Sequence, residues 1–331
     1  MRLEDFDYPL DPERIAQHPV TRREDSRLLV VRNPGVVHAH FCDLPVLLAA
    51  GTVLVLNDSA VIPARLYGRK LGSGGEVELL CVRELTPWRW TCLARSAKPL
   101  RPGSEILVDG ARVRVTHRGE ELVEIEAEEP VAGLLARAGH VPLPPYIRRA
   151  EEPQDRERYQ TVYARAPGSV AAPTAGLHFT ADLLGELGRR GVEVRKATLH
   201  VGPGTFLPVR GEIQDHRLLP ERYDIPRETC TAVEQANRDG RSVIAVGTTT
   251  VRALEQWAAT GVARGEADRM ILPGHEFRAV TGMVTNFHHP KTTLLMLVAA
   301  LGGRDRVLSA YREALRAGYR FLSYGDAMLL P

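Results

Sequence analysis

The sequence has few features of a secreted protein, a membrane-spanning protein or a protein stabilised by a bound metal. It contains four cysteines, none of them in a C-x-x-C pair, and no apolar run approaches the roughly 18 residues that a membrane helix needs. A chain of 331 residues can bury a core without disulfides, so reduced thiols are expected. The first residues, Met1–Asp5, include two acids and no signal-peptide core. We therefore expect a cytoplasmic protein that makes no contact with a membrane.

Neither sign of charge is in excess. The chain has 43 Lys and Arg residues against 41 Asp and Glu residues, a formal net charge of +2. Nucleic-acid-binding domains usually carry a basic surplus or patch, so the total charge neither supports nor excludes such a partner. Lysine is scarce, which makes Lys291 conspicuous in its polar loop. Eleven histidines are present, but no H-x-x-x-H or Cys/His pair spacing occurs, so no metal centre is predicted.

Apolar runs and turn residues divide the chain into three segments. Residues 1–66 and 140–331 alternate helices and strands, which predicts a mixed, largely parallel α/β sheet that is either open or barrel-like. Residues 67–139 contain short strand candidates separated by turns such as Asp109-Gly110, with no convincing helix. This middle segment predicts a small antiparallel β-barrel, inserted into an α/β domain that is built from both ends of the chain.

Caps and periodicity predict the individual elements of the α/β domain. Thr180 should cap one helix, and Pro290 suits the first turn of another. In α/β sheets, ligands bind beyond the carboxyl ends of strands, so polar residues that follow strands are candidates for a site. The predicted strands cover 26–32, 53–56, 192–201, 242–246, 283–285 and 319–323, and the helices 43–50, 180–190, 227–238, 251–259, 290–301 and 304–317.

Five polar clusters flank these strands, at 57–65, 168–179, 200–206, 247–252 and 285–293. Each also has a purely structural interpretation, because Asn, Asp, Ser and Gly favour turns and Thr caps helices. Small residues before a helix in the second cluster suit the binding of an anion. Three consecutive threonines in the fourth exceed what one cap needs. In the fifth, a desolvated lysine could act as a base, which arginine cannot.

Seven stretches, taken together, carry a resemblance to a known family. They are L-N-D at 56–58 with V-I-P-A-R at 61–65, D-R-E-R-Y-Q-T-V-Y at 155–163, A-A-P-T-A-G-L-H-F at 171–179, H-V-G-P-G-T-F at 200–206, G-T-T-T-V-R at 247–252, T-N-F-H at 285–288 and S-Y-G-D-A at 323–327. In order and along nearly the whole chain, they resemble the QueA family of queuosine biosynthesis. The inserted barrel also matches the two-domain layout of that family.

The resemblance implies a specific reaction. The ribosyl part of S-adenosylmethionine is transferred and isomerised onto 7-aminomethyl-7-deazaguanine at the wobble position of tRNA. Adenine and methionine leave, and epoxyqueuosine remains. S-adenosylmethionine is the co-substrate, no metal or further cofactor is implied, and the acceptor is a tRNA with a GUN anticodon. The expected oligomeric state is a monomer.

Loop position selects the candidate site residues. The reaction needs a base for the ribose 5′-carbon beside the sulfonium, an acid for the departing adenine and a neutral amine, and acid–base help at each step is worth roughly 10²–10⁴-fold. Thr248, Thr249 and Arg252 are assigned to the methionine carboxylate or the ribose. The catalytic candidates are Asp58, His178, His200, His288 and Lys291; the substrate-binding candidates are Arg65, Thr174, Gly176, Gly202, Gly204, Thr205, Thr248, Thr249, Arg252, Asn286 and Asp326.

One position departs from the family pattern. The family usually carries H-x-M-H-x-E, and residues 216–221 here retain the first His and the Glu, but Leu219 replaces the second His. Leucine cannot supply a proton or a hydrogen bond, so this position is dispensable or the activity has drifted.

Partner binding and function leave alternatives open. Arg148, Arg149, Arg156 and Arg158 form a basic stretch that suits tRNA, although interleaved acids also fit a solvated face. One alternative function is an S-adenosylmethionine-dependent enzyme with a small-molecule acceptor, which Leu219 would allow. Another is a non-catalytic RNA-binding protein whose barrel is the RNA platform. Release of adenine separates the three.

Overall fold

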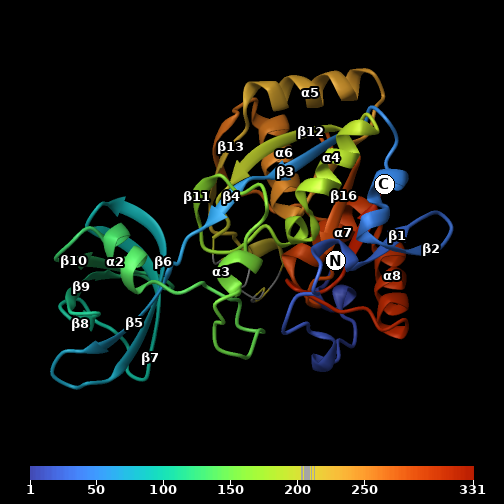
Figure 1. Cartoon of the computed structure of the whole chain (residues 1–331). Coiled ribbons are helices and arrows are strands. Elements are labelled where there is room, and N and C mark those ends of the chain that lie inside the picture. The colour runs from blue at the N-terminus through green and yellow to red at the C-terminus, as the bar shows by residue number, and fades with distance from the viewer. Residues whose placement is uncertain (203, 205–208, 210, 212) are drawn as a thin grey trace.

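The computed structural model describes residues 1–202, 204, 209, 211 and 213–331 (Figure 1). In this part of the chain a nine-stranded sheet carries helices on both faces, a closed six-stranded barrel stands beside it, and β4 (Ser59–Val61) pairs with β11 (Ala166–Ser169). Both ends of the chain contribute strands to the large sheet, and the barrel comes from the stretch between them. The predicted α/β fold with an inserted barrel is confirmed.

The large sheet is parallel at its centre and antiparallel toward its edges. Strands β12, β3, β14 and β16 run parallel, as do β17 and β1, and the remaining pairs are antiparallel. The sheet is open, so the barrel-like alternative for this domain does not apply. In sheet order the strands are β15 (Arg264–Ala267), β13 (Glu221–Asp224), β12 (Glu193–Leu199), β3 (Val53–Asn57), β14 (Val243–Val246), β16 (Gly282–Asn286), β17 (Ala327–Leu330), β1 (Arg27–Val31) and β2 (Val36–His40).

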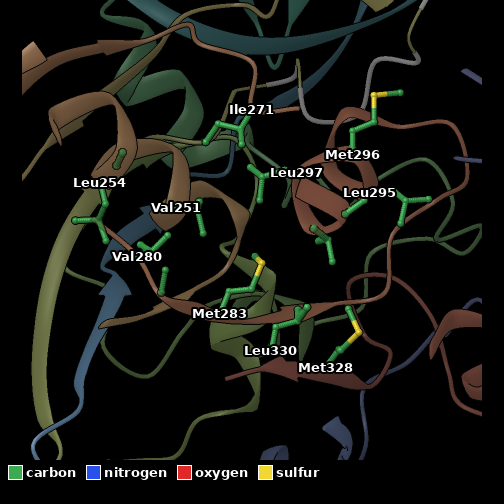
Figure 2. Close-up of a cluster of buried hydrophobic side chains, with 14 of the residues drawn as sticks. Val251, Leu254, Ile271, Val280, Met283, Leu295, Met296, Leu297, Met328 and Leu330 are labelled. Atoms are coloured by element: carbon green, nitrogen blue, oxygen red, sulfur yellow. The ribbon is translucent and has the colours of Figure 1, made fainter. Parts of the chain in front are cut away.

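The apolar run of β3 shows why the sheet is covered on both faces. Side chains alternate between faces along a strand, and Val53 and Val55 join one core while Leu54 and Leu56 join the other. On the first face, α6 and α7 pack against β16 and β17 through residues such as Leu254, Leu297 and Met283 (Figure 2).

Eight α-helices occur in the described ranges, together with short 3₁₀ turns. They are α1 (Leu44–Leu47), α2 (Val131–Ala138), α3 (Asp155–Arg158), α4 (Ala181–Arg189), α5 (Arg227–Arg238), α6 (Thr248–Thr260), α7 (Thr293–Gly302) and α8 (Arg304–Arg316). The 3₁₀ turns are η1 (Leu3–Phe6), η2 (Pro12–Arg14), η3 (Arg23–Asp25), η4 (Phe41–Asp43), η5 (Thr174–His178) and η7 (Ile213–Asp215). The predicted Thr180 cap of α4 is confirmed by its hydrogen bond to the Leu183 amide. No helix in these ranges is long and apolar enough to cross a membrane.

The barrel is antiparallel and closes through the pairing of β9 with β10. Around the barrel the strands are β10 (Val123–Ala127), β7 (Arg89–Ser96), β6 (Glu76–Thr86), β5 (Arg65–Lys70), β8 (Glu105–Val108) and β9 (Ala111–Arg118). Helix α2 covers its core with Val131, Leu134 and Leu135, so the expectation of no helix in this segment is wrong. Arg65 and His140 exchange both backbone hydrogen bonds where the chain enters and leaves the barrel.

Three other elements differ from the prediction. The last strand is β17, not 319–323, where only Phe321 forms a single bridge with Ile15. Helix α6 begins three residues earlier than predicted, so the threonine cluster forms its first turn. Helix α7 is capped by Thr292 and excludes Pro290. The final chain reversal is fixed by Asp326, whose carboxylate accepts from two backbone amides that sequence patterns do not reveal.

Candidate active site

A cavity of about 580 Å³ lies at the carboxyl ends of β14 and β16. Six predicted site residues line it: Thr174, Thr248, Thr249, Asn286, His288 and Lys291. Its walls also include Leu3, Pro145, Tyr146, Arg148, Ala171, Ala172, Pro173, Ala175, Val201, Val209, Gly247, Thr285, Phe287, His289, Pro290, Thr292, Leu294, Leu322 and Ser323. Segments far apart in the sequence therefore meet at one sheet edge, as expected for an α/β sheet.

The first turn of α6 forms one wall. Gly247 has φ 89° and ψ 151°, a conformation that favours glycine, and it turns the chain from β14 into the helix. Thr250 donates its hydroxyl back to the Val246 carbonyl at 2.6 Å. Thr249 accepts from the amide of Asn57 at 3.2 Å, whereas no described residue hydrogen-bonds the Thr248 hydroxyl. The wall thus presents a free hydroxyl beside the unpaired amides of a helix N-terminus, which suits an anion.

Asn57, which no site prediction included, ties this wall to the rest of the sheet. Its side-chain amide donates to the Leu199 carbonyl and to Thr249, and its Oδ1 accepts from the Leu199 amide at 3.1 Å. It therefore joins the ends of β3 and β12 to the start of α6. Its side chain is 1% exposed, which leaves it a structural role.

Asn286 forms part of a second wall at the end of β16. Asn286 lines the cavity, and His178 lies behind it with Nε2 3.2 Å from the Asn286 amide nitrogen and Nδ1 2.9 Å from the Ser26 hydroxyl. Burial lowers the pKa of His178 to about 3, so the ring is neutral. His178 therefore does not line the cavity for which it was predicted as a catalytic group.

His288 lies directly on the cavity. Its Nε2 is 2.9 Å from the Thr285 hydroxyl, its backbone amide donates to Tyr311 at 3.0 Å, and its carbonyl accepts from Tyr8. Burial and, to a smaller extent, the neighbouring His289 lower the pKa of His288 to about 3. The imidazole is thus held neutral and fixed in place at the cavity wall.

Lys291 lies on the cavity rim, but its environment is not the predicted one. Its ammonium pairs with the Asp7 carboxylate at 2.8 Å, and the side chain is 38% exposed. The hydrogen bond and the charge of Asp7 raise its pKa, so Lys291 is charged rather than a desolvated base. Its φ of 57° and its backbone bond to Phe6 fix the turn before α7.

Several cavity residues are absent from the predicted catalytic and substrate-binding residues. Tyr146 shares a 2.7 Å hydrogen bond with Ser323, and the His289 ring packs edge-on against Tyr146. Burial lowers the pKa of His289 and raises that of Tyr146. The side chain of Arg148 is exposed at the cavity and has no hydrogen-bond or ion-pair partner among the described residues. Signals in the sequence were available for three of them: Ser323 belongs to the stretch at 323–327, His289 to the polar cluster at 285–293 and Arg148 to the predicted basic stretch.

Asp58 and His200 form a separate cluster outside the cavity lining. The Asp58 carboxylate accepts from Thr198 at 2.6 Å and pairs with Arg165 at 3.4 Å. Burial lowers the pKa of His200, Arg222 adds to the effect and Asp58 opposes it. Gly168 leaves room for this ring, because a Cβ there would lie 3.0 Å from its Nδ1. The structure does not bring these two candidates to the cavity that holds His288.

Arg252 is held by protein groups rather than facing the cavity. It pairs with the buried Glu221 carboxylate and donates to the Ala267 carbonyl at 2.8 Å, while Glu221 accepts from the Gly202 amide at 2.7 Å. Arg252 does not line the large cavity, whereas the sequence-based prediction placed it against the methionine carboxylate or the ribose. The pair borders a smaller cavity of about 20 Å³ with Gly204 and Leu219.

The remaining substrate-binding candidates make internal contacts. Arg65 donates to the Leu143 carbonyl at 2.8 Å and pairs with Glu78, at the neck of the barrel. Gly176 packs against Tyr163, whose hydroxyl would lie 2.1 Å from an added Cβ. Asp326 accepts from the Arg27 and Arg320 amides, and none of these three candidates lines the cavity. Thr205 lies outside the described residues.

Two arginines of the predicted basic stretch, Arg149 and Arg158, make contacts within the protein, whereas Arg148 and Arg156 are exposed. Arg149 forms two hydrogen bonds with the buried Asp155 carboxylate, and Arg158 donates to the backbone carbonyls of residues 20 and 21. Arg156 lies near Glu151, 3.6 Å away. Of the four arginines, only Arg148 faces the cavity. In the described ranges, no group of three or more His, Cys, Asp or Glu side chains could hold a metal ion.

Comparisons with known proteins identify the family. The family model described as "Queuosine biosynthesis protein" matches residues 3–330. A protein of Anaeromyxobacter sp. (strain Fw109-5) named S-adenosylmethionine:tRNA ribosyltransferase-isomerase is 53% identical over 342 residues, covering 100% of this chain and 99% of that protein. One of the same name from Geobacter sulfurreducens is 49% identical over 343 residues, with 100% of both chains covered.

A solved structure agrees with these matches. The crystal structure of S-adenosylmethionine tRNA ribosyltransferase from Thermotoga maritima shares 34% identity with this chain and a TM-score of 0.56, covering 99% of this chain and 100% of that one. The match to the family model spans nearly every residue, and the relatives align over their full length. The chain therefore belongs to the queuosine biosynthesis protein family.

Proposed function

We propose that this chain is an S-adenosylmethionine:tRNA ribosyltransferase-isomerase. It transfers and isomerises the ribosyl group onto 7-aminomethyl-7-deazaguanine in tRNA, giving epoxyqueuosine and releasing adenine and methionine. The observation that carries the proposal is the 580 Å³ cavity, because five of the seven family-like stretches contribute residues to its wall, among them Ala171, Val201, Thr248, Asn286 and Ser323. The names of the relatives support the same reaction.

The cavity suits S-adenosylmethionine in size and in the distribution of its groups. Binding sites for small molecules usually measure about 300–1,000 Å³ and combine apolar walls with a few polar groups. The methionine carboxylate is assigned to the N-terminus of α6 and the Thr248 hydroxyl, which attract an anion. The apolar residues Pro173 and Leu322 of the cavity wall are assigned to the adenine.

Proton transfer is assigned to two titratable groups of the cavity wall that differ in charge, His288 and Lys291. His288 is neutral, so it can accept the proton that the sulfonium acidifies on the ribose 5′-carbon. Lys291 is charged, so it acts as a donor rather than as the base predicted from the sequence. Asp58 and His200 take supporting roles outside the cavity. They are the chain neighbours of Asn57 and Leu199, which hydrogen-bond each other, and Asn57 also donates to Thr249.

The acceptor is placed at the rim of the same cavity. Arg148 and Lys291 supply positive charge there, which suits the phosphates of tRNA. Following the resemblance, we propose that the acceptor is a tRNA with a GUN anticodon and that the enzyme is monomeric and cytoplasmic. Residues 67–139 are then an inserted domain between the segments 1–66 and 140–331, and S-adenosylmethionine is needed without a further cofactor.

Adenine release tests the proposal. The protein is incubated with S-adenosylmethionine and either tRNA that carries the aminomethyl base, unmodified tRNA or no tRNA, and free adenine is quantified by chromatography. We expect adenine only with the modified tRNA, and new epoxyqueuosine in the digested tRNA. Adenine release without tRNA would instead establish a small-molecule acceptor. Tight tRNA binding with no adenine under any condition would establish a binding protein.

A further inference from the structure

A directional chain of hydrogen bonds runs behind the wall of the cavity. Ser26 donates its hydroxyl to the Arg23 carbonyl at 3.2 Å, so its oxygen is left to accept from Nδ1 of His178 at 2.9 Å. Nε2 of His178 is then the acceptor of a neutral ring, and the amide nitrogen of Asn286 donates to it at 3.2 Å. These assignments place the hydrogen of the neutral His178 ring on Nδ1 and leave Nε2 as the acceptor.

The same chain fixes the orientation of the Asn286 amide. Its nitrogen has two hydrogens, and the second is directed at the Leu322 carbonyl at 3.1 Å, with the Asp326 carbonyl at 3.5 Å. A flipped amide would set Oδ1 against these two carbonyl oxygens. Both donors of Asn286 are therefore used inside the protein, and Oδ1 is left as its acceptor.

Oδ1 of Asn286 is the atom without a protein partner. The side chain is 2% exposed and lines the cavity, and no described residue donates to Oδ1. An unsatisfied buried acceptor costs about 1–3 kcal/mol in proteins, so we expect this oxygen to accept a hydrogen bond from a bound molecule. Because Asn286 lines the cavity, a ligand bound there is the nearest candidate to supply the missing donor.

We propose that Oδ1 of Asn286 accepts a hydrogen bond from an N–H or O–H donor of the bound sulfonium nucleoside, and that His178 is a positioning residue that holds the amide in this orientation. This rests on the proposed function for the identity of the ligand. It replaces the predicted catalytic role of His178, which does not line the cavity. The 6-amino group of adenine is one source of the donor, and the ribose hydroxyls or the methionine ammonium are the others.

Paired substitutions at His178 test the positioning role. Gln retains an acceptor where Nε2 lies, whereas Leu removes it and lets the Asn286 amide turn. Steady-state kinetics should show a KM for S-adenosylmethionine raised ~10-fold in His178→Leu and within about 3-fold of wild type in His178→Gln, since one hydrogen bond is worth about 1.4 kcal/mol or tenfold. The KM for tRNA should not change. A His178→Leu protein with a lower Tm but an unchanged KM would leave His178 only structural, and overturn the proposal.

Calorimetric binding separates the sources of the donor and tests Asn286 directly. Asn286→Leu should weaken S-adenosylmethionine ~10-fold or more. If the donor is the 6-amino group, Asn286→Leu should not weaken the 6-oxo analogue S-inosylmethionine; if it is a hydroxyl or the ammonium, both ligands weaken equally. Equal affinity of wild type and Asn286→Leu for both ligands would refute the proposal. A wild-type protein that binds S-adenosylmethionine but releases no adenine would refute the reaction alone, because the affinity comparison still applies.

Discussion

Two buried histidines, His288 on the cavity wall and His178 behind it, should make the protein lose stability in mild acid. His178 and His288 are 3% and 8% exposed, and burial lowers the pKa of each from 6.5 to about 3. Between these values the unfolded chain binds protons that the folded chain does not, so the free energy of unfolding falls as the pH falls. Above pH 6.5 both states are neutral and the effect vanishes.

The size of the effect follows from the shift. Each histidine lowers the free energy of unfolding by about 1.4 kcal/mol per pH unit below 6.5, which gives about 2 kcal/mol each at pH 5 and about 4 kcal/mol together. His200 and His289, whose pKa values burial also lowers, add loss of the same sign. Hydrogen bonds with Arg149 lower the pKa of the buried Asp155, so protonation of this carboxylate reduces the free energy of unfolding only below about pH 5.

Urea unfolding at pH 7.5 and pH 5.0 measures the loss. We expect the wild type to lose about 4 kcal/mol or more on acidification, and His178→Gln to lose about 2 kcal/mol less than the wild type, because one of the two titrating rings is gone. Equal stability of the wild type at the two pH values would refute the burial argument. An unchanged pH dependence in His178→Gln would show that this ring is not the titrating group.

Three further perturbations probe the site. Thr248→Val removes a hydroxyl at the start of α6 that no described residue hydrogen-bonds, and it should lower kcat/KM for S-adenosylmethionine ~10-fold; unchanged kinetics would remove Thr248 from the binding site. Arg252→Leu leaves the Glu221 carboxylate buried without its guanidinium and should cost about 3–5 kcal/mol in urea unfolding, and a loss below 1 kcal/mol would contradict this. Replacing Arg148 and Lys291 by Met should make tRNA affinity less dependent on salt, and an unaltered salt dependence would place the tRNA elsewhere.

The sequence predicts the central strands and their polar ends well, because the physics there is local. The apolar run of β3 is buried on both faces, and Thr248, Asn286 and His288 follow parallel strands whose carboxyl ends share one edge. The edge strand β15 and its neighbour β13 are not predicted, because both are short and polar and they pair only with each other and, for β13, with β12.

The roles of individual polar residues are harder to predict, because a polar residue that binds a ligand and one that binds another part of the protein look alike in the sequence. Arg252 and Asp326 sit in the expected loops, but their partners are Glu221 and backbone amides. Lys291 is charged because Asp7, at the other end of the chain, pairs with it. These partners are set by tertiary contacts that no local spacing encodes.

A crystal structure of the protein with S-adenosylmethionine tests the location of the site most directly. We expect the ligand in the 580 Å³ cavity, with its carboxylate against Thr248 at the start of α6 and its ribose beside His288. Electron density for the ligand at Asp58 and His200, with the cavity unoccupied, would contradict the assignment.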